Sequence, residues 1–334
     1  MKTTDGHPLN LSAAIALSPD RIQADLAPFR LLSSQGLDLY LLPGERFGPY
    51  AEAVGELREL TYRQQLSGSG NSRDLDSRDP HYDHFLLVET SSGELAGSAR
   101  LQCVPAQATA HAAADTAAHT GADDACLDPA ALPGSRQSYL EHVYPGIKAD
   151  LASRGNHLEI GRVALAPRFQ RQPHTLMLLF RGGLQVAVGA GYSSIHGLVS
   201  YNHFAYDDAV NRAFLGTLMR PPFLDPSSPH PQPRHPLDGL APDPRPAGVA
   251  TIQELELDIR HRLDPAFRLP VLLRQYINLM EARVRNLSLA RDFNQITEIL
   301  MAAELERIPP RRLDHFIAFE HRPIYRTFSW YRGG

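Results

Sequence analysis

The sequence of 334 residues contains little cysteine: Cys103 and Cys126 are its two examples. Two cysteines are too few for a disulfide framework, and their spacing is unlike that of a metal site, so we expect two reduced thiols. The sequence also lacks an uninterrupted apolar run of about 18 residues, which argues against a membrane-spanning helix, and its start lacks the apolar core of a signal peptide. These absences predict a cytoplasmic protein whose contact with a membrane, if it makes one, is peripheral.

A strong charge of either sign is missing as well. The net charge is −4, so nothing in the overall composition attracts nucleic acid or anionic lipid, and we expect no nucleic-acid partner. The apolar fraction of 43% and the charged fraction of 21% are ordinary for a globular protein. A chain of this length buries a substantial core, as one large domain or two small ones.

Two segments interrupt the globular pattern. Residues 103–137 are rich in Ala, Thr, Asp and His without a sustained apolar period, which predicts a long surface insertion. Residues 221–246 contain ten prolines, which predicts an extended or disordered stretch. The expected organisation is therefore an N-terminal extension (1–35), a core (36–220), a Pro-rich linker or loop (221–250) and a C-terminal part that completes the domain (251–334).

Residues 158–200 are the stretch around which the rest of the chain is organised. An apolar run over 158–166 ends at Pro167 and predicts a strand, because proline cannot donate to a ladder. Apolar residues then recur at helical spacing over 176–192, and 195–199 read as the next short strand. Strand, helix and strand of these lengths predict a βαβ unit whose ligand site lies at the carboxyl ends of the strands.

The remaining elements follow from shorter patterns. Alternation predicts a strand over 36–42, and a turn signal between 85–88 and 95–101 predicts a hairpin. Helical spacing predicts helices over 21–32, 49–65, 252–263 and 269–284. Residues 297–303 are apolar and fit either a last strand or a buried helix.

Five motifs occur in a recognisable order along this chain. They read Arg58-Glu59-Leu60-Thr61-Tyr62, the acids from Asp74 to Asp83, the hairpin His84 to Leu101, Glu159-Ile160-Gly161-Arg162, and Asp292-Phe293-Asn294. In this order they resemble the GNAT (Gcn5-related N-acyltransferase) superfamily, and most of all its branch of autoinducer synthases and haemolysin-like ornithine-lipid N-acyltransferases. The resemblance covers roughly residues 40–102 and 157–315.

That resemblance implies an α/β protein with the GNAT (acyl-CoA N-acyltransferase) fold. The fold has a central mixed, twisted sheet flanked by helices, here with a Pro-rich excursion and a helical C-terminal extension. It implies transfer of an acyl group from a thioester, with no permanently bound cofactor and no metal.

The acceptor side is expected to consist of arginines and aspartates. In the related autoinducer synthases these residues shape the acceptor site, and a guanidinium binds a carboxylate with two hydrogen bonds, which suits an acceptor that carries both an amine and a carboxylate. Alternation along the strand places Arg162 and Glu159 on opposite faces, so Arg162 is expected to brace the Asp-rich loop that contains Asp74. A structural salt bridge is the competing interpretation for each arginine taken alone. The expected acceptor-binding residues are Arg58, Asp76, Asp79, Arg100 and Arg162.

Glu159 is the candidate general base. It is a carboxylate in an otherwise apolar strand, where partial burial strengthens a carboxylate as a proton acceptor, directly or through an ordered water. The competing interpretation is a structural ion pair with Arg100 or Arg162. Tyr201 follows the next strand, where many GNAT enzymes have the tyrosine that protonates the leaving thiol, although Tyr201 and Tyr206 also fit as packing residues.

The loop before the main helix points to the donor. In GNAT enzymes that use CoA this loop contains glycines whose amides hold a pyrophosphate, whereas residues 170–175 contain no glycine and Pro173 removes one amide donor. The departure favours the acyl-phosphopantetheine of acyl carrier protein over acyl-CoA, since arginines near the loop suit an acidic protein surface. Backbone amides after a bulge in the strand would face the thioester carbonyl, as in relatives. The expected donor-binding residues are Val163, Leu165, Arg168, Arg171, His174 and Thr175.

Together these observations predict an N-acyltransferase that moves a long-chain acyl group from acyl carrier protein to the amine of an amino acid or a related small molecule, as in aminolipid synthesis. An acyl-CoA-dependent N-acetyltransferase is the enzymatic alternative. A catalytically inactive module that binds acyl carrier protein or lipid is the second alternative.

Overall fold

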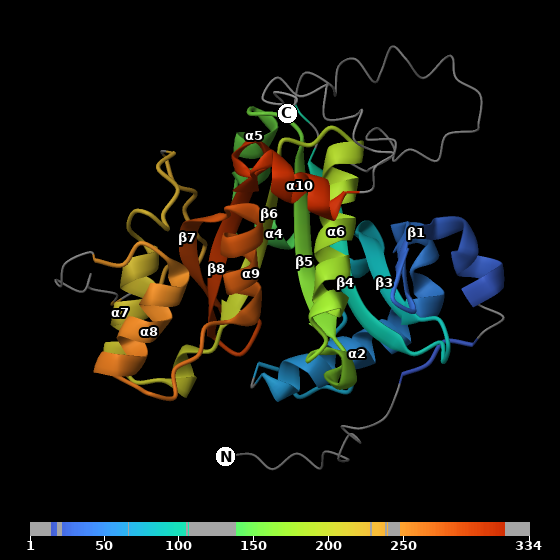
Figure 1. Cartoon of the computed structure of the whole chain (residues 1–334), viewed down its shortest axis with the longest axis horizontal. Helices are drawn as coiled ribbons and strands as arrows, with labels where there is room; N and C mark the ends of the chain where they lie inside the picture. The colour runs from blue at the N-terminus through green and yellow to red at the C-terminus, as the bar shows by residue number, and fades with distance from the viewer. Residues whose placement is uncertain are drawn as a thin grey trace. The chain divides into compact units, whose positions relative to one another are not determined.

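The computed structural model describes residues 15–18, 22–65, 67–104, 106, 138–227, 229–237, 239 and 248–317. The protein is of the predicted α/β class: eight strands form a mixed sheet in the order β1-β2-β3-β4-β5-β6-β8-β7, with helices on it (Figure 1). The chain divides into two compact units. Unit 1 consists of residues 1–101 and 162–182, and unit 2 consists of residues 102–161 and 183–334.

Unit 1 contains an antiparallel series of four strands. These are β1 (Arg30–Ser34), β2 (Leu37–Leu42), β3 (Asp83–Glu89) and β4 (Leu95–Val104), the last of which runs on into unit 2. The predicted hairpin is confirmed: β3 pairs with β4 from Asp83↔Leu101 to Val88↔Leu95. All ten residues of β4 are buried, including the polar Ser98, Arg100 and Gln102.

The helices of unit 1 follow their apolar patterns. The predicted helix over 49–65 is α2 (Ala51–Gln64), which buries Val54 and Leu57. α6 (Pro173–Gly189) begins in unit 1, where Gly182 leaves no room for a Cβ because Leu39 and Phe85 fill that space. Short 3-10 turns are η2 (Ala27–Phe29), η3 (Gly44–Arg46), η4 (Gly48–Tyr50), η5 (Asp79–His81) and η7 (Pro167–Phe169), and η1 (Ile22–Leu26) is a π-helical turn.

Unit 2 contains the parallel pair that the sequence predicts. β5 (His157–Leu165) pairs with β6 (Ser194–Tyr201) in three positions, from His157↔Ser194 to Glu159↔His196, and α6 connects the two strands. β5 ends in unit 1, after Gly161. On the other side β6 pairs antiparallel with β8 (Ile296–Glu304), which pairs in turn with β7 (Arg283–Ala290). The strand interpretation of 297–303 is therefore confirmed.

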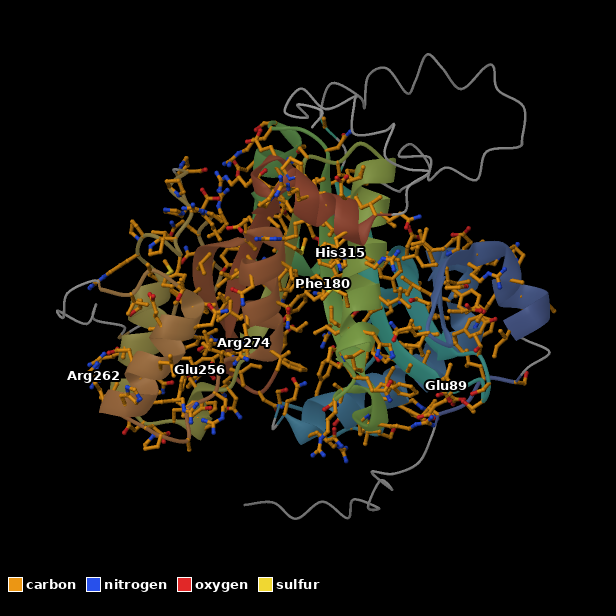
Figure 2. The ribbon with its side chains drawn as sticks, viewed as in Figure 1. Glu89, Phe180, Glu256, Arg262, Arg274 and His315 are labelled. Carbon is orange, nitrogen blue, oxygen red and sulfur yellow. The ribbon has the colours of Figure 1, made fainter. Side chains whose placement is uncertain are left out.

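Six further helices belong to unit 2. They are α4 (Tyr139–Val143), α5 (Ile147–Ala152), α7 (Asp208–Leu218), α8 (Ile252–Arg262), α9 (Val271–Met280) and α10 (Pro310–Phe316), with the turns η8 (His203–Ala205) and η9 (Leu305–Arg307). α7 and α8 lie side by side, and α9 lies against β8 (Figure 1). Figure 2 labels Glu256 of α8 and Arg274 of α9, whose side chains form an ion pair of 2.8 Å.

Two helix predictions are wrong in part. The helix expected over 21–32 gives way to β1 at Arg30, because Pro28 lacks the amide that a helix interior needs and the following residues pair with β2. The helix expected over 269–284 ends at Met280, since Glu281 adopts a left-handed φ of 52° and β7 begins at Arg283. In both places pairing with a neighbouring strand outweighs the local helical period.

The described part of the Pro-rich segment is irregular, as predicted, and lies against unit 2. Asp225 donates its amide to the Val284 carbonyl at 2.8 Å, and the Leu289 amide of β7 donates to His235 at 2.9 Å. Of the predicted insertion at 103–137, residues 105 and 107–137 lie outside the described residues. Among the residues that the structure describes, no helix has the length and apolarity needed to cross a membrane.

Candidate active site

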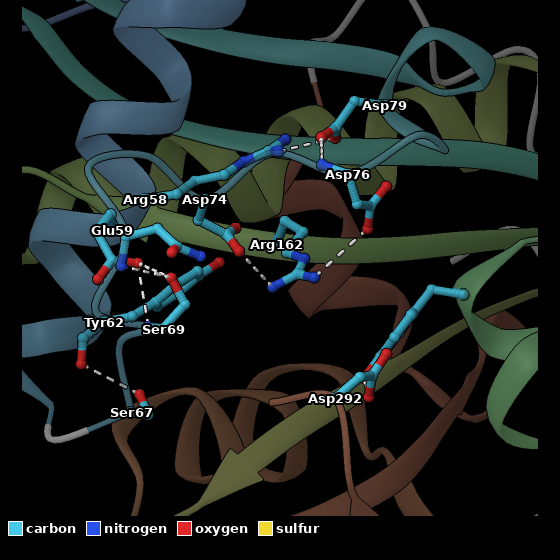
Figure 3. Close-up of polar contacts among 12 residues, drawn as sticks. Arg58, Glu59, Tyr62, Ser67, Ser69, Asp74, Asp76, Asp79, Arg162 and Asp292 are labelled. Atoms are coloured by element: carbon cyan, nitrogen blue, oxygen red, sulfur yellow. Dashed lines mark hydrogen bonds and ion pairs between the residues drawn. The ribbon is translucent and has the colours of Figure 1, made fainter. Parts of the chain in front are cut away.

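The predicted acceptor residues of unit 1 form one network of charges. α2 supplies Arg58, the loop before β3 supplies the aspartates, and β4 and β5 supply Arg100 and Arg162. Figure 3 shows Arg58 directed at Asp79, and Arg162 between the carboxylates of Asp74 and Asp76. The N–O distances are 2.8 Å for Arg58–Asp79, 3.0 Å for Arg100–Asp79, 3.1 Å for Arg100–Asp76, 3.0 Å for Arg162–Asp74 and 3.5 Å for Arg162–Asp76.

Burial divides this network into a closed and an open part. Arg58, Asp79 and Arg100 are at most 2% exposed, so they are inaccessible as they stand. The side chains of Asp76 and Arg162 keep 21% and 16% of their surface exposed. The closed part is therefore suited to hold the loop in place, and the open part is suited to meet a small polar molecule.

The acids in the network differ in their pKa values. Burial by itself raises the pKa of Asp79, but the guanidinium groups of Arg58 and Arg100 outweigh it and hold this pKa well below its usual range. Burial also acts to raise the pKa of Asp76, but its ion pair with Arg100 outweighs burial and lowers this pKa. At Asp74 burial prevails over Arg162 and raises the pKa. Asp76 and Asp79 are thus charged at neutral pH.

His84 of β3, to which the sequence analysis assigned no role, contacts both Arg58 and the Asp79 backbone in this network. His84 stacks on Phe47 with ring centroids 3.6 Å apart, and burial, together with Arg58, lowers its pKa to about 3. An arginine only donates, so Nδ1 of His84 accepts from Arg58 at 3.5 Å, and Nε2 carries the proton and donates to the Asp79 carbonyl at 2.8 Å. His84 is therefore neutral and fixed in one tautomer.

Glu59, beside Arg58 in α2, anchors the start of the Asp-rich loop. Its carboxylate accepts from Arg63 at 2.6 Å, from the Ser69 hydroxyl at 2.8 Å and from the Gly70 amide at 2.9 Å (Figure 3). Burial acts to raise the pKa of Glu59, but these hydrogen bonds lower it overall. The loop that carries the aspartates is therefore tied to α2 at both of its ends.

Glu159 is buried in β5, within unit 2, with 5% of its surface exposed. Its Oε1 accepts a hydrogen bond of 3.2 Å from the Leu140 amide at the start of α4. Lys148 of α5, which sequence reasoning missed, lies within electrostatic range: burial lowers the pKa of Lys148, and Glu159 acts against this shift. Lys148 also donates to the Gln102 side chain. The base candidate thus has an ordered amide and a partly desolvated amine beside it.

The strand that carries Glu159 is irregular three residues later. Arg162 has a φ of 52°, in the left-handed region that a side chain rarely adopts. The regular alternation that the sequence analysis assumed when it placed Glu159 and Arg162 on opposite faces therefore stops at Arg162, where the backbone turns. An interruption just before Val163 is what the predicted role of the Val163 amide requires. The Leu165 carbonyl accepts from Thr61 at 2.9 Å and from Gln170 at 3.0 Å.

The predicted donor residues around the start of α6 differ in their surroundings. Arg168 forms ion pairs of 2.7 Å with Glu94 and 2.8 Å with Glu89, so much of its charge is already compensated. Arg171 is exposed, and His174 is half-buried. Thr175 is fully buried, and its amide donates to the Gln172 carbonyl at 3.1 Å. Of the two arginines, Arg171 is therefore more available than Arg168 to contact an acidic partner.

Tyr201 lies at the end of β6 in a packed aromatic cluster. Its hydroxyl donates to the Asn211 side chain at 2.8 Å, and its ring stacks on Tyr206 at 6.0 Å. Burial and the neighbouring Tyr206 raise its pKa, so it stays protonated at neutral pH. Tyr201 is five residues beyond His196, which pairs with Glu159, so the two lie roughly 16 Å apart along the strands and on opposite faces. The structure does not bring Glu159 and Tyr201 together.

A comparison of the sequence with known protein families gives a match to part of the chain. A family model described as an acetyltransferase (GNAT) domain matches residues 57–180. No curated protein is significantly similar in sequence.

Solved structures with a similar course of the chain have low sequence identity. TofI in a ternary complex with an inhibitor and MTA is 11% identical, covers 83% of this chain and 96% of its own, and has a TM-score of 0.40. The loading GNATL domain of CurA from Lyngbya majuscula is 13% identical, with coverages of 81% and 99% and a TM-score of 0.35. MesI, a CoA-dependent acyl-homoserine lactone synthase, is 10% identical, with coverages of 89% and 97% and a TM-score of 0.38. We draw nothing on substrate from likenesses of this size.

Proposed function

We propose that this chain is an acyltransferase that transfers a long-chain acyl group from acyl carrier protein to the amine of an amino acid or a related small molecule. The match of residues 57–180 to a family model described as an acetyltransferase (GNAT) domain supports the acyl transfer. The observation that carries the proposal is the open end of the Arg–Asp network, Asp76 with Arg162. An acceptor that has both an amine and a carboxylate matches this pair of opposite charges.

In the proposed reaction Glu159 takes the proton from the acceptor amine. The amine nitrogen then forms its bond to the thioester carbon, and the bond from that carbon to sulfur breaks. The hydrogen bond from the Leu140 amide supports a fixed orientation of the Glu159 carboxylate.

The other steps use the predicted donor residues. Backbone amides at Val163 and Leu165 would stabilise the oxyanion, and the left-handed residue before them supports this role because it turns the backbone out of a regular ladder. Tyr201 keeps its proton at neutral pH, as the acid for the departing thiolate must. In the tetrahedral intermediate the amine nitrogen and the sulfur are bonded to one carbon, so a hydroxyl roughly 16 Å from Glu159 does not act on the same intermediate, and the proposal assigns no residue to this proton transfer.

Acyl carrier protein is favoured as the donor by the sequence of the loop before α6. Residues 170–175 lack the glycines that give a pyrophosphate its amides, and the exposed Arg171 suits an acidic surface. The half-buried His174, at the start of α6, would line the path of the phosphopantetheine arm, whereas Thr175 is fully buried and would only support this turn.

Intact-mass detection of acyl transfer tests the proposal. The protein is mixed with palmitoyl acyl carrier protein, palmitoyl-CoA or acetyl-CoA, each against a pool of amino acids. We expect loss of the acyl group from the carrier protein and a new N-acyl product, with Glu159→Gln slower by about 10²-fold or more. Glu298→Gln is the matched control, because Glu298 is also a buried strand carboxylate, 3% exposed.

Each other outcome selects an alternative. Turnover with acetyl-CoA alone would contradict the carrier-protein donor and indicate a CoA-dependent N-acetyltransferase. Equal turnover by Glu159→Gln and the wild type would show that Glu159 is not the general base. Binding of the carrier protein without turnover of any donor would leave the inactive binding module as the function.

A further inference from the structure

Unit 2 contains a polar pocket away from the residues discussed so far. Its volume is about 200 Å³, and it lies where β5 and β6 begin and β8 ends. The ligand site proposed above uses residues of β5 from Glu159 onward, whereas this pocket contains His157, two residues earlier, at the amino-terminal end of the same parallel strands. We name it the β5-start pocket; its polar lining consists of Arg154, His157, Ser193, Arg285, Glu304 and Glu306.

Arg285 of β7 is the residue that points to a ligand. It lines the pocket although it is only 2% exposed, and its ion pair with Asp225 is long, at 4.0 Å. Among the residues that the structure describes, its Nε has no hydrogen-bond partner. A buried guanidinium with unused donors is costly, so a carboxylate in the pocket would complete it.

Acidic groups stand on another part of the lining. Glu304, the last residue of β8, is half-buried, and burial raises its pKa, while Glu306 is exposed. The second arginine of the pocket, Arg154, is already paired with Asp150 at 2.7 Å. The lining therefore offers one under-used cation and two carboxylates, a pattern that suits a molecule with both charges.

The charges around the pocket favour a cationic side chain in that molecule. Asp225 also pairs with Arg307, at 3.6 Å, so its charge is shared between two arginines. The histidine on the wall adds no charge, because burial lowers the pKa of His157 to about 4. Asp150, Asp225 and Arg307 do not line the pocket but belong to the ion pairs around it. With them included, four carboxylates stand against three guanidinium groups, namely Asp150, Asp225, Glu304 and Glu306 against Arg154, Arg285 and Arg307.

We propose that the β5-start pocket binds a free α-amino acid with a cationic side chain, its carboxylate on Arg285 and its ammonium groups on Glu304 and Glu306. This site is separate from the proposed acyl-transfer site and does not depend on turnover. A pocket of about 200 Å³ has room for such a molecule.

Calorimetric titration of the full chain tests the proposal with L-lysine, L-alanine, L-glutamate and acetate as probes. We expect L-lysine to bind most tightly, L-alanine more weakly, and L-glutamate and acetate not measurably. Glu306→Gln should weaken L-lysine binding by about tenfold or more, because an ammonium group loses its carboxylate. Arg154→Met should not weaken it, because this change makes the charge around the pocket more negative. Arg262→Met is the matched control, because Arg262 (Figure 2) pairs with Asp258 four residues away, as Arg154 does with Asp150, at similar exposure.

A second variant separates the two sites. Arg162→Gln changes the proposed acceptor site and should leave L-lysine binding at the pocket unchanged. Loss of binding in Arg162→Gln with retention in Glu306→Gln would place the amino acid at the acceptor site and overturn the proposal. Equal binding of L-glutamate and L-lysine, or no binding of any probe at millimolar concentration, would also overturn it, whether or not acyl transfer is found.

Discussion

At the scale of single residues, neighbouring arginines of the same network have different tasks. Arg58 is fully buried, and its ion pair with Asp79 at 2.8 Å lies out of reach of any ligand. Removing one partner of a buried pair leaves a charge without compensation, which typically costs about 3–5 kcal/mol. We expect Arg58→Met to lower the free energy of unfolding by about 3 kcal/mol, since Arg100 still faces Asp79; urea unfolding measures this. A change below about 0.5 kcal/mol would contradict the assignment.

Arg162, at the open end, should behave differently. Its substitution by glutamine removes the partner of Asp74 at 3.0 Å, but burial already raises the pKa of Asp74, so this carboxyl can take up a proton instead. The free energy of unfolding should therefore fall by about 1–2 kcal/mol, less than in Arg58→Met. The Michaelis constant for the acceptor should rise about tenfold or more, because a charged hydrogen bond to the acceptor carboxylate is lost. Steady-state kinetics with the acceptor found by mass spectrometry provide the measurement. An unchanged Michaelis constant would show that Arg162 only braces the loop.

Asp83 makes a residue-scale prediction about pH. Burial raises its pKa to about 6, against about 3.9 in an unfolded chain. The folded state therefore favours the protonated carboxyl: this stability is fully present below about pH 4 and is lost as the pH rises through about 6. Asp83→Asn, which keeps an acceptor for the Gly44 amide, should be more stable than the wild type by about 1 kcal/mol at pH 7.5, with no such gain at pH 4. Urea denaturation curves of Asp83→Asn and of the wild type at both pH values test this prediction.

At the scale of elements, α6 contains a matched pair of glycines. A Cβ at Gly182 would meet Leu39 and Phe85, whereas a Cβ at Gly189 meets nothing within 4 Å. Gly182→Ala should destabilise the protein by about 1–3 kcal/mol through overpacking. Gly189→Ala should be neutral or stabilising by up to about 1 kcal/mol, because alanine favours the helix. Similar losses for both variants in urea unfolding would contradict the tight packing at Gly182.

The same scale shows why some elements were predictable from the sequence. α2, α6 and the β3–β4 hairpin have a clear period or turn signal within their own residues, and the sequence predicts them. β1 and β7 were missed because their pairing is decided by partner strands elsewhere in the chain. α4 and α5 are short, and what fixes them is the apolar cluster they share with Leu300 of β8, which no local period reveals.

The candidate site was predictable to a similar extent. Family resemblance led to the residues of the Arg–Asp network, but the division into a closed end at Arg58 and an open end at Arg162 depends on burial, which a sequence does not contain. The β5-start pocket was missed because its lining comes from segments far apart in the chain, such as Arg154 and Glu304. Lys148 had no signal, since its distance from Glu159 is set by the packing of α5.

At the scale of the whole molecule, buried histidines set the response to acid. Burial lowers the pKa of His84 to about 3 and of His157 to about 4, and that of His196 well below its usual range. Stability from these neutral rings is fully present above about pH 6.5 and is lost as the pH falls towards their folded-state values. With three protons taken up on unfolding, the free energy of unfolding should fall by up to about 4 kcal/mol per pH unit, less the opposing effect of Asp83.

Urea unfolding at pH 7.0 and at pH 5.5 checks this response. His261→Gln is the control, because His261 is exposed in α8 and its replacement should leave the slope unchanged. A free energy of unfolding that stays constant between these two pH values would show that the three rings are not kept neutral by the fold.

The route of the chain through the two units limits where its gene can be truncated or recombined without dividing a unit. The chain passes from one unit to the other three times, after Leu101 in β4, after Gly161 in β5 and after Gly182 in α6. No single cut at these points separates the two units. Residues 1–182 contain all of unit 1 but also residues 102–161 of unit 2, and residues 1–101 alone lack the Leu165 carbonyl to which Thr61 donates. Recombination that exchanges an intact unit 1 must therefore carry a second, distant segment, residues 162–182, with it.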